Sequence, residues 1–272
     1  MEKDRARLPV IYSAHHAGHS FEHRGLSKYA ALTPEQRIRF SDYGTADTVP
    51  KNGSITLINP HSRALGDLNR NPDDDKGFAK KDHGKPTPNN VWQDEYELSN
   101  EMKRNLRKEL YEPYHLNILT QVRALEENGV VVAWDNTADY VIGKNQDGDD
   151  VHMPDIILSN RGAENKTEEN GIEIPSCEPQ LLEVYGFELQ KELEKRGISV
   201  DIFYNLVYFG GYITRHYSTA RNGDVLDTDK KIQSFQIEYN TKLTHDQETL
   251  TPYPKKIAAF REAAEEAMHN TL

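Results

Sequence analysis

Cysteine is almost absent from this 272-residue sequence, which contains only Cys177. A single cysteine cannot form a disulfide within the chain, and disulfides are typical of oxidising compartments. The first residues also lack the apolar segment that directs secretion. We therefore expect a cytoplasmic protein. No histidine and aspartate pattern accompanies Cys177, so we do not expect it to act as a nucleophile.

Long apolar runs and an excess of basic residues are missing too. No apolar stretch approaches the roughly 20 residues that a membrane-spanning helix needs. The chain has 33 lysines and arginines against 44 aspartates and glutamates, and its net charge is −11. Nucleic-acid binding needs a basic surface, so this balance argues against that class and leaves room for a local anion pocket. We expect a small-molecule partner, with no nucleic acid and no membrane, and the sequence does not predict the oligomeric state.

The chain has no Pro/Gly/Ser-rich linker, internal repeat, glycine-rich phosphate loop or G-x-S-x-G turn. Strand and helix patterns alternate instead, which predicts one α/β domain over residues 1–272 with a central mixed, mostly parallel sheet. A partly irregular alternation in the last strand allows a bulge there. A long polar loop is expected at 71–91. Strands are expected at 8–13, 55–62, 130–134, 198–205, 208–218 and 232–240, and helices at 33–44, 99–127, 179–197 and after Pro254.

The segment SRALGDLNR at 62–70 concentrates polar chemistry in nine residues. Arg63 and Arg70 can each present a planar fork of donors to a carboxylate. Asp67 can hold one of these forks in place, and Asn69 tolerates a tight left-handed turn. The segment is therefore either an anion-binding turn or a surface turn with a solvated ion pair.

Histidines gather directly after the first strand, in SAHHAGH at 13–19. Imidazoles beside a glycine at a strand end can bind a metal, although the spacing matches neither H-E-x-x-H nor a zinc finger. Asp42 and Asp47 in SDYGTAD offer carboxylate ligands to the same ion. A polar loop with incidental histidines, and a turn stabilised by aspartates, are the alternatives.

Polar residues also mark three later strand segments. Glu238 lies in QIEYN, and alternation places it on one face with Gln236 and Asn240. Burial of that carboxylate is costly unless it is paired or moves protons, but a half-exposed strand would show the same pattern. Asp135 ends the apolar run VVVAW, a site position in an α/β sheet, and Arg161 follows IILSN as a further possible anion contact.

Taken in order, these segments resemble the N-formylglutamate amidohydrolase family over roughly residues 10–245. The resemblance implies a three-layer fold similar to the zinc carboxypeptidases and aspartoacylase. It also implies a metal-dependent hydrolase that cleaves an N-acyl amide from an acidic amino acid. The matching pieces are HAG at 16–18, SDYGTAD at 41–47, SRALGDLNR at 62–70, EPYH at 112–115, the strand with Asp135, PDIILSNR at 154–161, GGYITRH at 210–216 and QIEYN at 236–240.

The resemblance also implies roles for individual residues. His16 would be the first metal ligand and Asp42 a carboxylate ligand, with Asp47 and Glu22 as further choices, and zinc would be the cofactor. Glu238 would activate water, and His216 would lie near the substrate as a second catalytic residue. The expected substrate contacts are Arg63, Asn69, Arg70 and Arg161.

One position departs from the family pattern. The pattern after the central strand is Asp-x-His-Ser, with a metal-binding histidine, whereas this chain has Asp135-Asn136-Thr137-Ala138. A catalytic zinc usually has three protein ligands. Either His216, His15 or His19 supplies the missing ligand, or metal binding is weak or lost. The second case predicts a catalytically silent protein that binds a small carboxylate; a related amidase with another acyl substrate is the alternative among enzymes.

Overall fold

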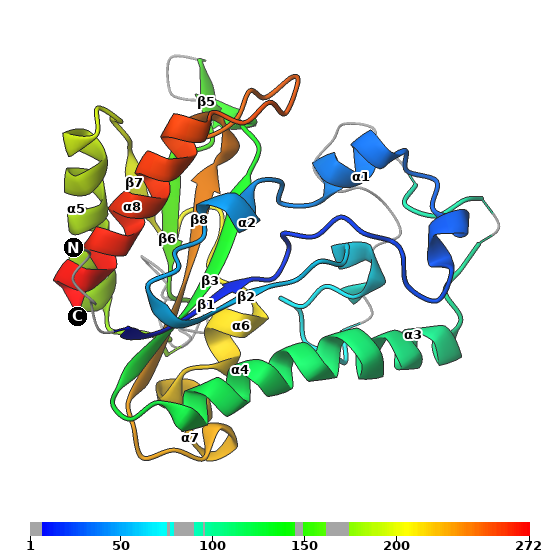
Figure 1. Ribbon diagram of the computed structural model, residues 1–272, viewed down its shortest axis with the longest axis horizontal. Coiled ribbons are helices and arrows are strands. Elements are labelled where there is room, and N and C mark those ends of the chain that lie inside the picture. Colours follow the sequence, from blue (N-terminus) through cyan, green and yellow to red (C-terminus); the bar gives the residue numbers. More distant parts are fainter. Residues whose placement is uncertain (1–6, 75–76, 79–89, 95, 145–148, 162–173) are drawn as a thin grey trace, which may run out of the picture.

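A computed structural model gives the fold of the chain (Figure 1). It describes residues 7–74, 77–78, 90–94, 96–144, 149–161 and 174–272. A six-stranded sheet forms the centre, and every neighbouring pair is parallel except β6 with β8. The expected mixed, mostly parallel sheet is confirmed. In spatial order its strands are β2 (Gly53–Ile58), β1 (Leu8–Ala14), β3 (Gly129–Thr137), β8 (Ile232–Asn240), β6 (Ile156–Ser159) and β7 (Ile202–Tyr204).

Helices cover both faces of this sheet and give the three layers visible in Figure 1. Successive side chains along each strand point to opposite faces of the sheet, so the apolar core has two halves, one on each face. Tyr12 and Trp134 pack toward α5 (Pro179–Lys195) and α8 (Pro254–Thr271). Ile11 and Val131 pack toward α4 (Glu112–Ala124), α6 (Tyr212–His216) and α7 (Thr219–Leu226). The α/β three-layer prediction is therefore confirmed. Among the described helices, none is both long and apolar enough to cross a bilayer.

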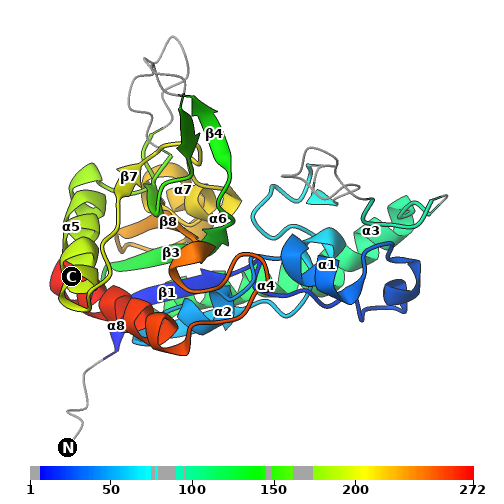
Figure 2. The same ribbon diagram turned by 90° about the horizontal axis from the view of Figure 1, so that it is seen from above.

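A second region extends from one edge of the sheet and has its own apolar cluster, which includes Phe21, Trp92 and Leu106 (Figure 2). The expected helix at 33–44 begins there at Pro34, where Thr33 and Gln36 form a reciprocal capping box, and it ends earlier, at Phe40. The region contains η1 (Leu26–Tyr29), α1 (Pro34–Phe40), η2 (Arg63–Leu65) and α3 (Asn100–Leu106). The remaining elements are α2 (Thr45–Thr48), the hairpin of β4 (Val141–Lys144) and β5 (Asp150–His152), and η6 (Thr241–Leu243).

The helix expected at 99–127 is interrupted near the proline that suggested a break. A π-helical turn, η4 (Arg107–Tyr111), joins α3 to α4, whose second residue is Pro113. Proline has no N–H to bond the carbonyl four residues earlier, so a local change of helical pattern is expected there. The helix ends at Ala124, and Gly129 already belongs to β3.

One strand prediction is wrong. Residues 208–218 do not form a strand: the segment turns at Gly210 and continues as the short helix α6. The bulge allowed in β8 is also absent, because β8 pairs with β3 without a register shift from Ile232 to Asn240. The strand expected at 198–205 is shorter than predicted, since β7 spans only Ile202–Tyr204.

Candidate active site

The sheet register brings three chemically active side chains to one level. Ser13 pairs with Ala133 across β1 and β3, and Asp135 pairs with Glu238 across β3 and β8. His15 lies two residues beyond Ser13 and, by alternation, on the same face. This face carries α4 and α6, so His15, Asp135 and Glu238 form a row beneath them. All three side chains are buried.

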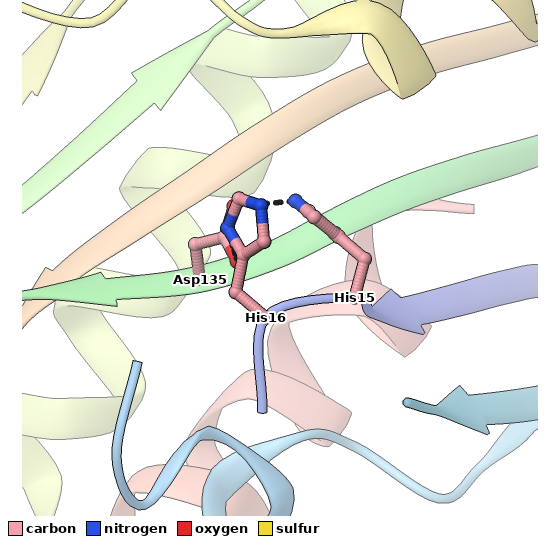
Figure 3. Close-up of side chains that lie close together, drawn as sticks. All are labelled: His15, His16 and Asp135. Atoms are coloured by element: carbon pink, nitrogen blue, oxygen red, sulfur yellow. Dashed lines mark ion pairs between the residues drawn. The ribbon is translucent and has the colours of Figure 1, made fainter. Parts of the chain in front are cut away.

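His15 and Asp135 face each other closely enough to form an ion pair, which Figure 3 marks with a dashed line. His15 Nδ1 donates to the Ser13 carbonyl at 3.1 Å, so Nε2 is the ring nitrogen that faces Asp135. That Nε2 is 2.8 Å from Asp135 Oδ2. Within the described chain, His15 Nε2 and Asp135 Oδ1 both lack a hydrogen-bond partner. The Asp135 carboxylate therefore calls for a positive charge at this nitrogen, which either a proton on Nε2 or a bound cation supplies.

His16 sits between acidic groups on both sides. Its Nε2 is 2.7 Å from Asp67 Oδ1, and its Nδ1 is 3.1 Å from Asp42 Oδ2 and 3.4 Å from Asp135 Oδ1. Burial and Arg63 oppose protonation, but the three carboxylates outweigh them and raise the pKa of His16 well above its usual value. The Asp67 contact also fixes which nitrogen carries the outer proton, as in histidines that bind metals.

These groups fit a cation. One ligand atom each from His15, His16 and Asp135 lies within 4.8 Å of the others. Imidazole nitrogen and carboxylate oxygen are both zinc donors, and each histidine has its other nitrogen held by a hydrogen bond. Burial opposes ionisation of Asp135, but His15 and His16 hold its pKa well below its usual range. The set is therefore preoriented and buried, and it contains an ionised carboxylate.

Glu238 is the third carboxyl group of the site. It is 7% exposed and accepts a 2.5 Å hydrogen bond from Gln236 Nε2, which also lies 3.3 Å from Asp135 Oδ2. Burial, followed by the charges of Asp135 and Asp42, raises the pKa of Glu238 well above its usual value. Several carboxyl groups thus share one poorly solvated volume, where a cation or a shared proton lowers their repulsion.

The turn of residues 62–70 closes the site against α6. Arg63 Nη2 lies 2.8 Å from Asp67 Oδ2, so the expected hold on one guanidinium is present. Asn69 accepts hydrogen bonds from Tyr212 N and Ile213 N through its carbonyl and its side-chain oxygen, each at 2.9 Å. These contacts satisfy two N–H groups in the first turn of α6. A segment far away in the sequence therefore fixes where α6 begins.

Five of the eight predicted site residues lie in one hydrogen-bonded and ion-paired network: His16, Asp42, Arg63, Asn69 and Glu238. Arg70 lies at its edge, with its Nε 3.5 Å from Asp67 Oδ2 and its side chain 43% exposed.

The other two predicted residues have different neighbours. His216 stacks on Tyr212, and burial lowers its pKa. Arg161 donates through Nη1 to the Gly210 carbonyl at 2.7 Å. Among the further choices for ligands, Asp47 and His19 are exposed.

The sequence did not predict that Gln236 has a central role in this network. Its amide connects Asp135, Glu238 and Asn69, and its Oε1 also accepts from Gly211 N at 2.8 Å. The alternation that placed Gln236 on the face of Glu238 was the available signal. It also missed the contact between His16 and Asp67, which no local pattern indicates.

Comparison with known proteins gives the family. The family model of N-formylglutamate amidohydrolase matches residues 8–244. The fold is similar to the crystal structure of N-formylglutamate amidohydrolase from Ralstonia eutropha JMP134, with a TM-score of 0.64 and 17% identity over 98% of this chain and 94% of that chain. A gene product from Agrobacterium tumefaciens has a TM-score of 0.57 and 14% identity over 97% of this chain and 92% of that one. No curated protein matches this chain. The chain is therefore an amidohydrolase that belongs to the N-formylglutamate amidohydrolase family.

Proposed function

We propose that this protein hydrolyses the amide bond of an N-formyl or other N-acyl acidic amino acid, such as N-formylglutamate, with the help of one divalent cation, zinc. The observation that carries the proposal is the buried row of His15, Asp135 and Glu238 beside His16. Two of its atoms lack hydrogen-bond partners among the described residues, and its carboxyl groups are too close to ionise independently. Family membership supports the amide substrate.

His15, His16 and Asp135 would hold the cation, and Asp42 remains a predicted carboxylate ligand because it faces the same nitrogen of His16. His15 thereby replaces the histidine that the family pattern has two residues after Asp135. A divalent cation in this place supplies a Lewis acid that polarises the acyl oxygen and lowers the pKa of water toward about 7.

Glu238 would move the proton of the reaction. The charge of a bound cation would favour the ionised form of Glu238. This carboxylate would take a proton from the attacking water and return it to the leaving amine, which makes one residue both base and acid. The Gln236 amide holds one Glu238 oxygen by a hydrogen bond and leaves the other oxygen for this exchange. Burial keeps competing water away from the carboxyl group.

Arginines would bind the carboxylates of the substrate. Arg70 is the stronger candidate for a clamp because its side chain is 43% exposed, whereas Arg63 is already paired with Asp67. Asn69 holds this turn against α6, where His216 lies. Arg161 remains a predicted contact. Positive groups at this one place explain how a chain of charge −11 could bind an acidic substrate.

Release of formate from N-formyl-L-glutamate, measured with zinc present, tests the proposal. Glu238→Gln should keep the fold but lower kcat by about 10²–10⁴, because the amide cannot accept the proton. Glu192→Gln is the matched control, since Glu192 is also a buried glutamate but pairs with Lys195 on α5, away from the site. It should leave kcat unchanged.

Two results would contradict the proposal in different ways. A wild-type chain that neither hydrolyses a panel of N-acyl acidic amino acids nor binds metal would favour the silent carboxylate-binding protein instead. Equal activity of wild type and Glu238→Gln would leave an amidohydrolase with a different proton acceptor.

A further inference from the structure

The loop between β7 and α6 has an unusually strained backbone. Asn205, Val207 and Gly210 have φ values of +50°, +62° and +89°. Glycine and asparagine adopt this left-handed conformation readily, but for a β-branched residue such as Val207 it is a true outlier. Backbone strain of this kind is concentrated at functional sites. The residue that follows the strained Val207 is Tyr208.

Contacts on both sides hold the strained loop in place. Ser159 Oγ donates to the Tyr208 carbonyl at 2.6 Å, and Arg161 N donates to the Phe209 carbonyl at 2.8 Å. Earlier in the loop, Asn205 Oδ1 accepts from Asn160 N at 3.0 Å. The end of β6 therefore fixes this loop, which makes the position of the Tyr208 side chain well defined.

The Tyr208 phenol reaches back to the catalytic face of the sheet. Its hydroxyl lies 3.4 Å from Thr137 Oγ1 and 3.0 Å from the hydroxyl of Tyr140. Thr137 is two residues beyond Asp135 in β3 and therefore on the same face, about 6.6 Å along the strand. Tyr208 thus lies beyond Asp135, at the C-terminal end of the row that contains Asp135 and Glu238. Burial and the nearby Glu238 carboxyl raise the pKa of Tyr208, so its phenol remains a neutral donor.

We propose that Tyr208 is a catalytic residue that contacts the substrate and donates a hydrogen bond to the acyl oxygen as negative charge develops there. The proposal rests on the hydrolysis of N-acyl amino acids proposed above. Thr137 stands where the family pattern has a histidine, and the phenol of Tyr208 meets its hydroxyl from the opposite loop. A hydrogen-bond donor fixed in a poorly solvated site stabilises an oxyanion without reorganisation.

The energetic reason for the strain follows from this role. A flexible phenol would lose entropy each time it met the acyl oxygen, whereas a phenol on a fixed loop has lost that freedom during folding. The left-handed Val207 is thus part of the positioning of Tyr208. This view predicts that removal of the phenol oxygen alone affects the reaction while leaving the fold intact.

Tyr208→Phe tests the proposal, because it removes one oxygen and keeps the ring. Formate release from N-formyl-L-glutamate should show a kcat about 10²-fold lower, the scale of one oxyanion donor. KM should change less than about 3-fold, since the charge that the phenol stabilises develops only in the transition state. The melting temperature should stay that of the wild type. Tyr204→Phe is the control: Tyr204 lies on β7, with its hydroxyl against Gly186 of α5, and should give wild-type kinetics.

The possible results are distinct. Wild-type kcat in Tyr208→Phe, with an active wild type, would overturn the role of Tyr208 and leave the proposed hydrolysis standing. An inactive wild type would overturn both proposals together. If Tyr208→Phe lowers the melting temperature, Thr137→Val serves as the second variant, since it keeps the phenol and removes only its neighbour. A loss of kcat in Thr137→Val as large as in Tyr208→Phe would indicate a structural role and overturn the proposal, and a much smaller loss would support it.

Discussion

Asp67 is the buried charge on which the geometry of the site depends, and Asp67→Asn tests this dependence. The carboxylate accepts hydrogen bonds from His16 Nε2 at 2.7 Å, Arg63 Nη2 at 2.8 Å and Asn69 N at 2.9 Å. Burial opposes its ionisation, but Arg63 and His16 hold the pKa of Asp67 well below its usual range. Asparagine has the same shape but offers one acceptor and one donor in place of two acceptors. One of the three partners therefore loses its acceptor.

The expected loss of stability depends on how deeply Asp67 and its partner Arg63 are buried. Removal of one partner from a buried ion pair costs about 3–5 kcal/mol, because the remaining charge is left unpaired. Asp67 is 7% exposed as a side chain, but Arg63 is 28% exposed, so water can solvate part of the freed guanidinium. We therefore expect a loss of about 2–3 kcal/mol. For a chain of this size, each kcal/mol lowers the melting temperature by about 2–4 °C, which gives a decrease of roughly 4–12 °C.

Thermal unfolding followed by circular dichroism at pH 7 measures this difference. Glu109→Gln is the matched control, because Glu109 pairs with Arg24 and His23 on the surface, where ion pairs contribute little. The control should melt at the wild-type temperature. The reasoning would be refuted if Asp67→Asn melted with the wild type, or if both variants lost the same amount.

Three further predictions concern binding, pH and packing. Arg70→Lys keeps the charge but loses the planar fork, so KM should rise about 10-fold with a smaller change in kcat; a kcat effect larger than the KM effect would contradict the clamp. Burial lowers the pKa of His115 to about 3, and its Nε2 donates to the Leu68 carbonyl. In the unfolded chain the same histidine has a pKa of about 6.5. The neutral histidine therefore stabilises the fold fully above about pH 6.5, and this stabilisation decreases as the pH falls toward about 3. The urea midpoints of wild type and His115→Gln should therefore converge between pH 7 and pH 4, and a constant difference would refute this. Gly211→Ala places a Cβ 2.2 Å from the Asn69 amide, so it should cost about 1–3 kcal/mol and lower kcat/KM, whereas unchanged unfolding and kinetics would show that the turn adapts.

Elements with a strong local pattern could be predicted from the sequence. The apolar run VVVAW became the central strand β3, and Pro179 and Pro254 begin the helices that cover one face of the sheet. The failed strand at 208–218 shows the limit of this approach. Its β-branched and aromatic residues favour a strand, but Asn69 accepts from the N–H groups of Tyr212 and Ile213 and thereby stabilises a helical turn. Such a contact cannot be seen in a local pattern.

The candidate site divides in the same way. Alternation placed Gln236 beside Glu238 on one face, and this follows from the sequence alone. Strand register across the sheet determines that Asp135 lies opposite Glu238. It also determines that His15, which follows β1, lies close to both of them. Register is determined by the packing of the whole core, so His15 could be named only as one of several possible ligands.

The most direct test of the central claim is an anomalous difference map, measured at the zinc absorption edge, from crystals of the chain grown with zinc. The account predicts one strong peak in the row beneath α6, within about 2.0–2.2 Å of His15 Nε2 and an oxygen of Asp135. His16 Nδ1 should complete the set of protein ligands. A zinc peak bound elsewhere, or no peak between His15 and Asp135, would contradict the account.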